Sequence, residues 1–167
     1  MPEEKKPVRL TPDRDPITGL VYNMNTGTKF EFPAMPDEIS DNENAQFEDQ
    51  AIAGRSAPIF NYSSSGPRSV SFSITLHDDY CKDGILATVN KFKALVYPSY
   101  RELIASPKCY IRIGDFIRCI CVVESVDVTW KKPYRNGIYI VADVNISLKE
   151  VADVPYSTHE IEGGIRK

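Results

Sequence analysis

Hydrophobic and polar residues alternate most regularly between residues 69 and 77. The apolar positions are Val70, Phe72, Ile74 and Leu76. Because successive side chains of a strand point to opposite faces, this pattern predicts a strand with one core face. The other face is a row of small neutral hydroxyl side chains, namely Ser69, Ser71, Ser73 and Thr75. Such a face suits close packing by another chain or a lining surface better than open water.

A second pattern has apolar residues at helical spacing. They are Ile85, Leu86, Val89, Phe92, Leu95 and Val96. Asp83 is suited to capping the first turn, and Pro98 limits continuation of the helix. The spacing therefore predicts a helix over 83–97 that packs on a sheet through this stripe. A further short turn of helix is expected at 100–105.

Other alternating segments predict strands on both sides of this helix. The predicted strands are 28–32, 45–53, 57–62, 108–113, 116–130 and 138–149. Turns are expected at 63–68, at Gly114-Asp115 and at 131–137, where glycine, proline and asparagine favour chain reversal. The last two strands exceed the ~5–6 residues typical of globular domains. Their hairpin should project from the core and need a neighbour to cover it.

Both of these long strands place their apolar residues on one face. In 138–149 they are Ile138, Ile140, Ala142, Val144, Ile146 and Leu148. In 116–130 they are Ile120, Val122, Val126, Val128 and Trp130, interrupted by Glu124. One amphipathic helix and several one-faced strands predict an α+β fold, mainly β, with an antiparallel sheet.

Composition shifts divide the chain into three parts. Residues 1–27 carry Pro2, Pro7, Pro12 and Pro16 among charged residues, and proline at this density predicts an extended arm. Residues 28–150 form the predicted β domain, and 151–167 form a C-terminal tail.

Length and charge exclude several classes of protein. The chain has 167 residues, 42% of them hydrophobic, and a net charge of −3. It is large enough for one domain with a real core, and it lacks the basic footprint of a nucleic-acid reader. No apolar run approaches the ~20 residues of a membrane span, and no signal peptide is visible. We expect the protein to be made in a cytoplasm.

Candidate chemistry is sparse. The four cysteines form no CxxC pair and are expected to be reduced, partly buried thiols. His77, Asp79 and Cys81 share a strand parity, but nothing is spaced to complete a metal shell, so a polar cluster is the favoured interpretation. No nucleophile, phosphate-loop or dinucleotide motif occurs. The sequence predicts no enzyme activity, no cofactor and no metal.

The charges are distributed unevenly. Seven acidic residues and no basic residue lie between 30 and 54, whereas the predicted 131–137 tip is basic. Taken separately, the acidic segment and the basic tip are each explained by a solvated loop. Together they allow a second hypothesis, in which the basic tip of one copy meets the acidic segment of the next. The candidate contact residues are Lys131, Lys132, Arg135, Asp37, Glu38 and Asp41, together with the hydroxyl row Ser69, Ser71, Ser73 and Thr75.

Several short motifs in a fixed order carry a family resemblance through residues 28–151. They are Phe30-Glu31-Phe32-Pro33, Pro36-Asp37-Glu38-Ile39-Ser40, Ala53-Gly54 with Pro58, Pro67-Arg68 before the hydroxyl strand, Leu76-His77-Asp78-Asp79, Leu95-Val96-Tyr97-Pro98, Pro107, Ile113-Gly114-Asp115 and the segment 144–150. The chain resembles the tube-type proteins of contractile injection systems and contractile-tailed phages. The baseplate branch of tube-initiator and hub-adaptor proteins is the closer match.

The resemblance implies a curled, barrel-like antiparallel sheet with one flanking helix, assembled as a hexameric ring around a channel. The implied partners are the chain itself, the tail tube, the hub and other baseplate proteins, with nucleic acid only as cargo and no membrane. The implied location is the tail baseplate of a virion, assembled in the bacterial host cytoplasm. Longer members carry a LysM module, for which this chain is too short, so peptidoglycan binding is not implied.

Two alternatives stay open. The chain could be the repeating tube protein, although that role needs no proline-rich arm. From a different class, it could be a small-ligand-binding β-barrel with Trp130 and Tyr139 near a pocket mouth, although the helix inserted in mid-chain argues against this.

Overall fold

The computed structural model describes residues 19–98, 107–115, 117–152 and 156–164. Within them the main sheet has seven strands in the order β2-β1-β7-β8-β9-β6-β3, with every neighbouring pair antiparallel. These strands are β1 (Gly19–Asn23), β2 (Lys29–Glu31), β3 (Glu38–Asn42), β6 (Ser69–His77), β7 (Lys108–Ile113), β8 (Ile117–Arg135) and β9 (Ile138–Glu150). The predicted fold class, α+β and mainly β, is confirmed.

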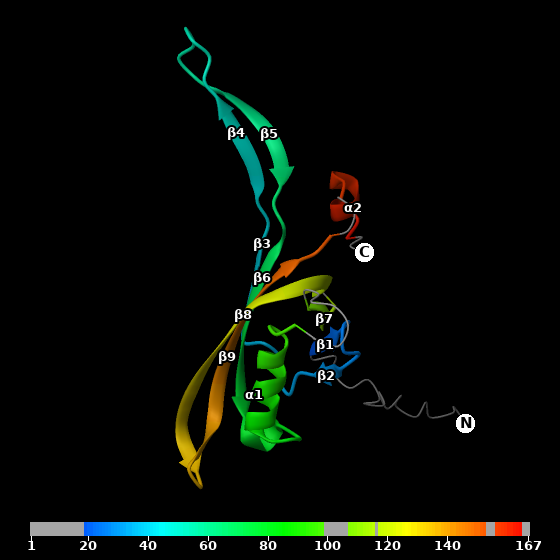
Figure 1. The fold of residues 1–167 in the computed structure, drawn as a ribbon, viewed down its shortest axis with the longest axis vertical. Coiled ribbons are helices and arrows are strands. Elements are labelled where there is room, and N and C mark those ends of the chain that lie inside the picture. Colours follow the sequence, from blue (N-terminus) through cyan, green and yellow to red (C-terminus); the bar gives the residue numbers. More distant parts are fainter. Residues whose placement is uncertain (1–18, 99–106, 116, 153–155, 165–167) are drawn as a thin grey trace, which may run out of the picture.

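A separate two-stranded hairpin projects from this body. It consists of β4 (Ala45–Gln50) and β5 (Ile59–Ser65), which pair only with each other among the described strands. Figure 1 shows the hairpin at one end of the long axis and the β8–β9 turn at the other. The chain therefore presents two projecting hairpins at opposite ends.

The helix α1 (Ile85–Ala94) covers one face of the sheet and completes the core. Ile85, Val89 and Phe92 are buried, as the apolar stripe predicted, whereas Leu86 is 53% exposed and does not pack inward. The predicted cap at Asp83 is wrong, because the backbone N–H of Ile85 donates instead to Asp78 Oδ1 at 2.9 Å. Short helical segments also occur at Asp78–Tyr80 (η1) and Thr158–Glu162 (α2).

Phenylalanine packing shows that the sheet curls around α1. Phe32 directly follows the edge strand β2, and Phe72 lies on β6, next to the opposite edge of the strand order. Their ring centroids are nevertheless only 5.7 Å apart, and Phe92 of the helix lies 5.5 Å from Phe32. A Cβ on Gly19 would lie 2.0 Å from the Phe32 ring, so this position on β1 requires glycine.

Strand β1 lies in the range that the sequence assigned to the arm. Its residues pair with β7 from Gly19↔Ile113 to Asn23↔Cys109, and Val21 is buried. The prediction that these residues belong to an extended arm is wrong. The run of prolines stops at Pro16, so the residues that follow are free to form a strand. The rest of that range before Gly19, and the helical turn expected at 100–105, lie outside the described residues.

A β-bulge in β8 changes which side chains face the core. The register shifts between Val123 and Ser125, so Glu124 is an extra residue and the side-chain alternation reverses there. Ile120 and Val122 consequently point away from the core face, contrary to the prediction. The core face of β8 consists of Cys119, Cys121 and Val123 before the bulge and of Val126, Val128 and Trp130 after it.

Two turns are shorter than predicted. Ser63, Ser64 and Ser65 continue β5, so the turn before β6 occupies 66–68. β8 runs to Arg135, and the reversal into β9 takes only Asn136 and Gly137. Both have positive φ, 52° and 80°, as a two-residue hairpin turn requires. The basic residues predicted in a loop therefore lie on a strand.

Candidate functional site

The hydroxyl face of β6 extends sideways into its neighbours. Ser71 is paired in register with Ser40 of β3 and Ser147 of β9, and Ser147 is paired with Ser125 of β8. Residues in cross-strand register point to the same face, so these serines form a row across the sheet. The predicted row along β6 is thus part of a broad face of small polar side chains, opposite the face that α1 covers.

This polar face holds a shallow hollow of about 260 Å³. Its polar lining residues are Glu38, Ser40, Ser71, Ser73, Asn145 and Ser147. The charges beside it are largely paired within the chain: Lys131 with Asp143, and Lys149 with Glu124 at 2.6 Å. The lining contains no histidine or cysteine, and its polar groups are four serine hydroxyls, one amide and one carboxylate.

Two strand edges flank this face and are open in the part of the chain that the structure describes. β3 pairs only with β6, and β7 pairs with β8 only as far as Val122. Residues 126–135, here called distal β8, therefore pair only with β9. Because β3, β6, β9 and β8 alternate in direction, β3 and distal β8 run antiparallel to each other.

The three acidic residues predicted as inter-copy contacts differ in their surroundings. The Asp37 side chain accepts the backbone N–H of Thr75 at 3.0 Å, beyond the end of the β3–β6 ladder. Asp41 is bound by Arg68, whose Nε lies 2.6 Å from Asp41 Oδ1. Glu38 is exposed at the edge strand. Two of the three carboxylates thus already stabilise the fold.

Arg68 is the centre of a buried ionic cluster. Its side chain is 7% exposed, and it lies near Asp41, Glu43 and Glu150, the last only 5% exposed. The hydrogen bond with Asp41 raises the pKa of Arg68, so the guanidinium stays charged. Tyr156 donates to Glu150 Oε1 at 3.4 Å. The cluster ties the base of the β4–β5 hairpin to the end of β9.

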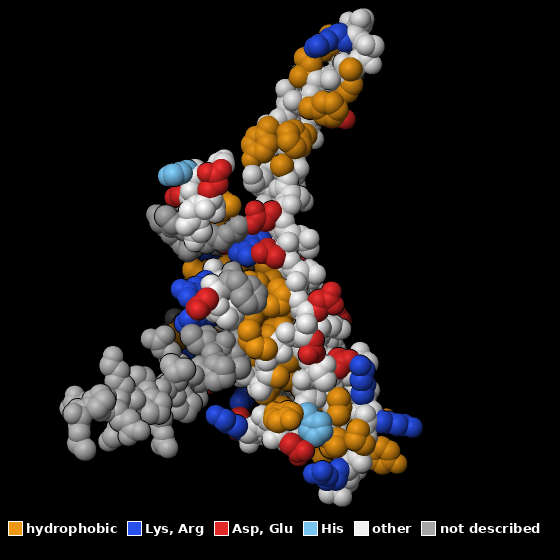
Figure 2. All heavy atoms as spheres, turned by 180° about the vertical axis from the view of Figure 1, so that it is seen from behind, with side chains coloured by type: hydrophobic (Ala, Val, Ile, Leu, Met, Phe, Trp, Pro, Cys, Tyr) orange, Lys and Arg blue, Asp and Glu red, His pale blue; other side chains and the backbone are white. Residues whose placement is uncertain are grey.

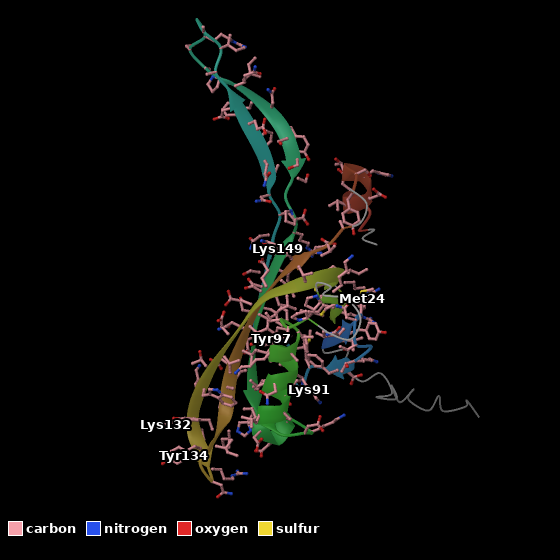
Figure 3. All side chains as sticks on the ribbon, viewed as in Figure 1. Met24, Lys91, Tyr97, Lys132, Tyr134 and Lys149 are labelled. Atoms are coloured by element: carbon pink, nitrogen blue, oxygen red, sulfur yellow. The ribbon has the colours of Figure 1, made fainter. Side chains whose placement is uncertain are left out.

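The basic residues lie at the end of the molecule opposite the β4–β5 hairpin. Lys131 makes the ion pair with Asp143, while Lys132 and Arg135 are exposed. Figure 3 shows Lys132 and Tyr134 at the end of the β8–β9 hairpin. Within one copy, the structure therefore does not bring the basic tip and the acidic 37–49 segment together.

Sequence reasoning missed the exposed aromatic residues of both hairpins. On β4–β5 they are Phe47, Phe60 and Tyr62, which are 58–65% exposed; on β8–β9 they are Tyr134 and Tyr139, with Ile138 beside them. Seen from behind, hydrophobic side chains gather at both ends of the long axis (Figure 2). The signal in the sequence was Phe47, which is the one large hydrophobic residue on its strand.

The histidine and cysteine side chains singled out in the sequence form no metal-binding cluster in the described ranges. His77 Nδ1 accepts the backbone N–H of Asp79, and no three His, Cys, Asp or Glu side chains there could hold a metal ion. All four cysteines are free and buried, as predicted, and burial raises the pKa of Cys109 to about 11. No described helix has both the length and the apolar character needed to cross a membrane.

A larger hollow of about 340 Å³ lies between the end of α1 and the β1–β2 turn. Its lining includes Phe30, Lys91 and Tyr97, the last two labelled in Figure 3. Neither Trp130 nor Tyr139 lines it. The pocket mouth expected for a ligand-binding barrel is therefore not found at this hollow.

Comparison with known proteins gives one family. Residues 18–157 match the family described as contractile injection system tube protein. No curated protein matches the chain.

Similar solved structures are distant in sequence. A chain from the virion of a native gene transfer agent particle has a TM-score of 0.45 and 14% identity, covering 84% of this chain and 95% of that chain. A chain from the six-fold symmetrised baseplate of the anti-feeding prophage has a TM-score of 0.46 and 10% identity, covering 80% of this chain and 87% of that chain.

Proposed function

The chain belongs to the contractile injection system tube protein family, and from this premise we propose that it is a structural baseplate protein of a contractile tail. Copies of it form a ring that initiates the tail tube or adapts the tube to the baseplate hub. The observation that carries the proposal is the pair of open, oppositely directed strand edges, β3 and distal β8.

These edges pair between neighbouring copies. When copies are related by rotation about an axis along the strands, β3 of one copy meets distal β8 of the next in antiparallel orientation, which is the ordinary ladder geometry. β3 offers five residues, Glu38–Asn42, to this ladder. Each copy uses one edge on each side, so in a closed ring β3 and distal β8 of every copy are paired.

The polar face then lines the channel of the ring. Because α1 covers the opposite face of the sheet, the helix lies on the outside and the serine-rich face points inward. Hydroxyl groups keep such a wall hydrated, and Lys131 and Lys149 are each paired with a carboxylate of the same copy, so Glu38 is the charged side chain that lines the hollow. A wall of this kind lets cargo, nucleic acid included, pass without being held.

The remaining assignments complete the proposal. The ring is hexameric and contacts the tail tube, the hub and other baseplate proteins in the virion, after assembly in the host cytoplasm. It acts without catalysis, a cofactor or a membrane. The β domain is flanked by a C-terminal tail and by an N-terminal arm. Because β1 belongs to the sheet, the boundary between arm and domain lies before Gly19.

Amide hydrogen exchange, read by mass spectrometry, tests the edge pairing. In the isolated subunit, outward N–H groups of β3 and distal β8 exchange rapidly, and in assembled rings identified by electron microscopy they become protected. Strand β7 is the internal control, since it is paired on both sides by β1 and β8 and should be protected in both states. Rings in which neither edge gains protection would refute the pairing. A chain that stays monomeric by light scattering, even with tail partners added, would refute the ring itself.

A further inference from the structure

The hollow of about 340 Å³ beside the end of α1 has an aromatic and proline-rich lining. Leu95, which is 3% exposed, and the half-buried Phe30 contribute apolar surface. Tyr97, Pro98 and Pro107 add to this lining, and Tyr97 is 70% exposed. Figure 3 shows Tyr97 beside α1. Grooves lined in this way bind extended, proline-rich segments.

Polar residues at the rim of the hollow bond to each other or to a nearby charge. Asn23 Oδ1 accepts the backbone N–H of Thr26 at 3.2 Å, and Thr26 Oγ1 donates to Thr28 Oγ1 at 2.9 Å. Lys91 forms an ion pair with Asp83. The hollow therefore favours a ligand that binds through apolar contacts rather than through charge.

The N-terminal arm contains a segment of matching chemistry. Residues 7–12, here called the arm segment, read PVRLTP. A polyproline II helix has three residues per turn, so Pro7 and Leu10 lie on one side of the segment in that conformation. Such a segment binds an aromatic-lined groove at a low cost in entropy, because proline restricts its conformation in advance. The arm thus presents one proline and one leucine together to an apolar hollow.

The arm is long enough to reach the hollow of its own copy. β1 begins at Gly19, and Asn23 at its other end lines the hollow, so the strand covers roughly 13 Å at ~3.3 Å per residue. The chain from Pro12 to Gly19 spans up to about 23 Å at the same rise. A short flexible connection also gives the arm a millimolar effective concentration at its own domain.

We propose that the arm segment docks in the hollow of the same copy, with Pro7 and Leu10 against Phe30 and Tyr97. The docked segment covers apolar surface at the end of α1, on the side of the sheet opposite the serine-rich face. This assigns to the arm a partner within its own chain. The contact forms in the isolated subunit, so it does not rest on the proposed ring.

Tryptic cleavage of the full chain after Arg9 measures whether the arm segment is docked. The rate is compared between wild type, Tyr97→Ser and the matched control Tyr80→Ser, because Tyr80 is 71% exposed but does not line the hollow. We expect cleavage to be about tenfold or more faster in Tyr97→Ser, since truncating a central interface tyrosine typically costs that factor or more. Wild type and Tyr80→Ser should be cleaved at the same slow rate. Thermal melts verify that both variants are folded. Equal rates in wild type and a folded Tyr97→Ser variant would overturn the docking.

A photo-crosslinking amino acid in place of Leu10 locates the contact without changing the hollow. Adducts within one chain to the tryptic fragment 94–101, which contains Tyr97, support the proposal. Adducts that join two chains at this fragment would show that copies exchange arms, which overturns docking within one copy. Adducts elsewhere, or none, overturn the contact itself. This measurement also decides the question if Tyr97→Ser does not fold.

Discussion

Replacing Phe92 with alanine removes the side chain at the centre of the helix–sheet contact. Phe92 is 0% exposed, and its ring lies 5.1 Å from that of Phe30 in a T-shaped contact and 5.5 Å from that of Phe32. Truncating a buried phenylalanine costs about 3–5 kcal/mol through lost transfer free energy and the cavity left behind. Since two aromatic contacts are lost as well, we expect the upper part of that range.

For a chain of this size, each kcal/mol lowers the melting temperature by roughly 2–4 °C, so Phe92→Ala should lower it by about 8–20 °C. Thermal and urea melts of the isolated subunit measure this change. Leu86→Ala on the same helix is the matched control, because Leu86 is 53% exposed and should change the free energy of unfolding by less than ~1 kcal/mol. Coincident melts of wild type and Phe92→Ala, or an equal loss in the control, would show that the packing is misassigned.

Three further results are expected. Arg68→Ala should destabilise the subunit by about 3–5 kcal/mol in urea, because it removes a buried cation that is bound by Asp41 and lies beside Glu150, whereas Lys149→Ala at an exposed pair should cost under ~1 kcal/mol. Reversing the exposed Lys132 and Arg135 to Glu should weaken association between copies and its dependence on salt; association with wild-type salt dependence would contradict a charge contact at this tip. Because burial raises the pKa of Cys109 to about 11, its contribution to stability is complete below the unfolded pKa near 9 and declines up to about pH 11, so urea melts of Cys109→Ala and wild type should converge over that interval.

Much of the fold could be predicted because its signals are local. The alternation in β6 fixed its bounds at Ser69–His77, and β7 was likewise predicted at 108–113. The helix was correct in place but not in its cap, since Asp78 reaches Ile85 from seven residues upstream. The spacing of residues within the helix does not predict a contact with a residue so far upstream.

The candidate surfaces were harder to predict because they depend on which strands pair. The bulge at Glu124 is defined by how β8 pairs with β9. The sequence of β8 alone therefore does not show that its core-facing and outward-facing positions exchange there. The exposed residues Phe47, Phe60 and Tyr62 lie on one face of the β4–β5 hairpin, although they come from two strands separated by a loop. The inter-copy role predicted for Asp37 and Asp41 remains a prediction, although both side chains now have partners within the fold.

The bond between the Asp37 carboxylate and the Thr75 N–H also bears on how faithfully copies assemble. Beyond the β3–β6 ladder, this carboxylate occupies a donor that would otherwise attract any passing strand. A newly made subunit therefore shows its neighbour a short pairing segment with a defined end, and a sliding register would have to displace a charged side chain. Edge-to-edge aggregation is discouraged in the same way, since an incoming chain meets negative charge where it seeks an amide. In the proposed ring, one short side chain thus sets where pairing between subunits ends.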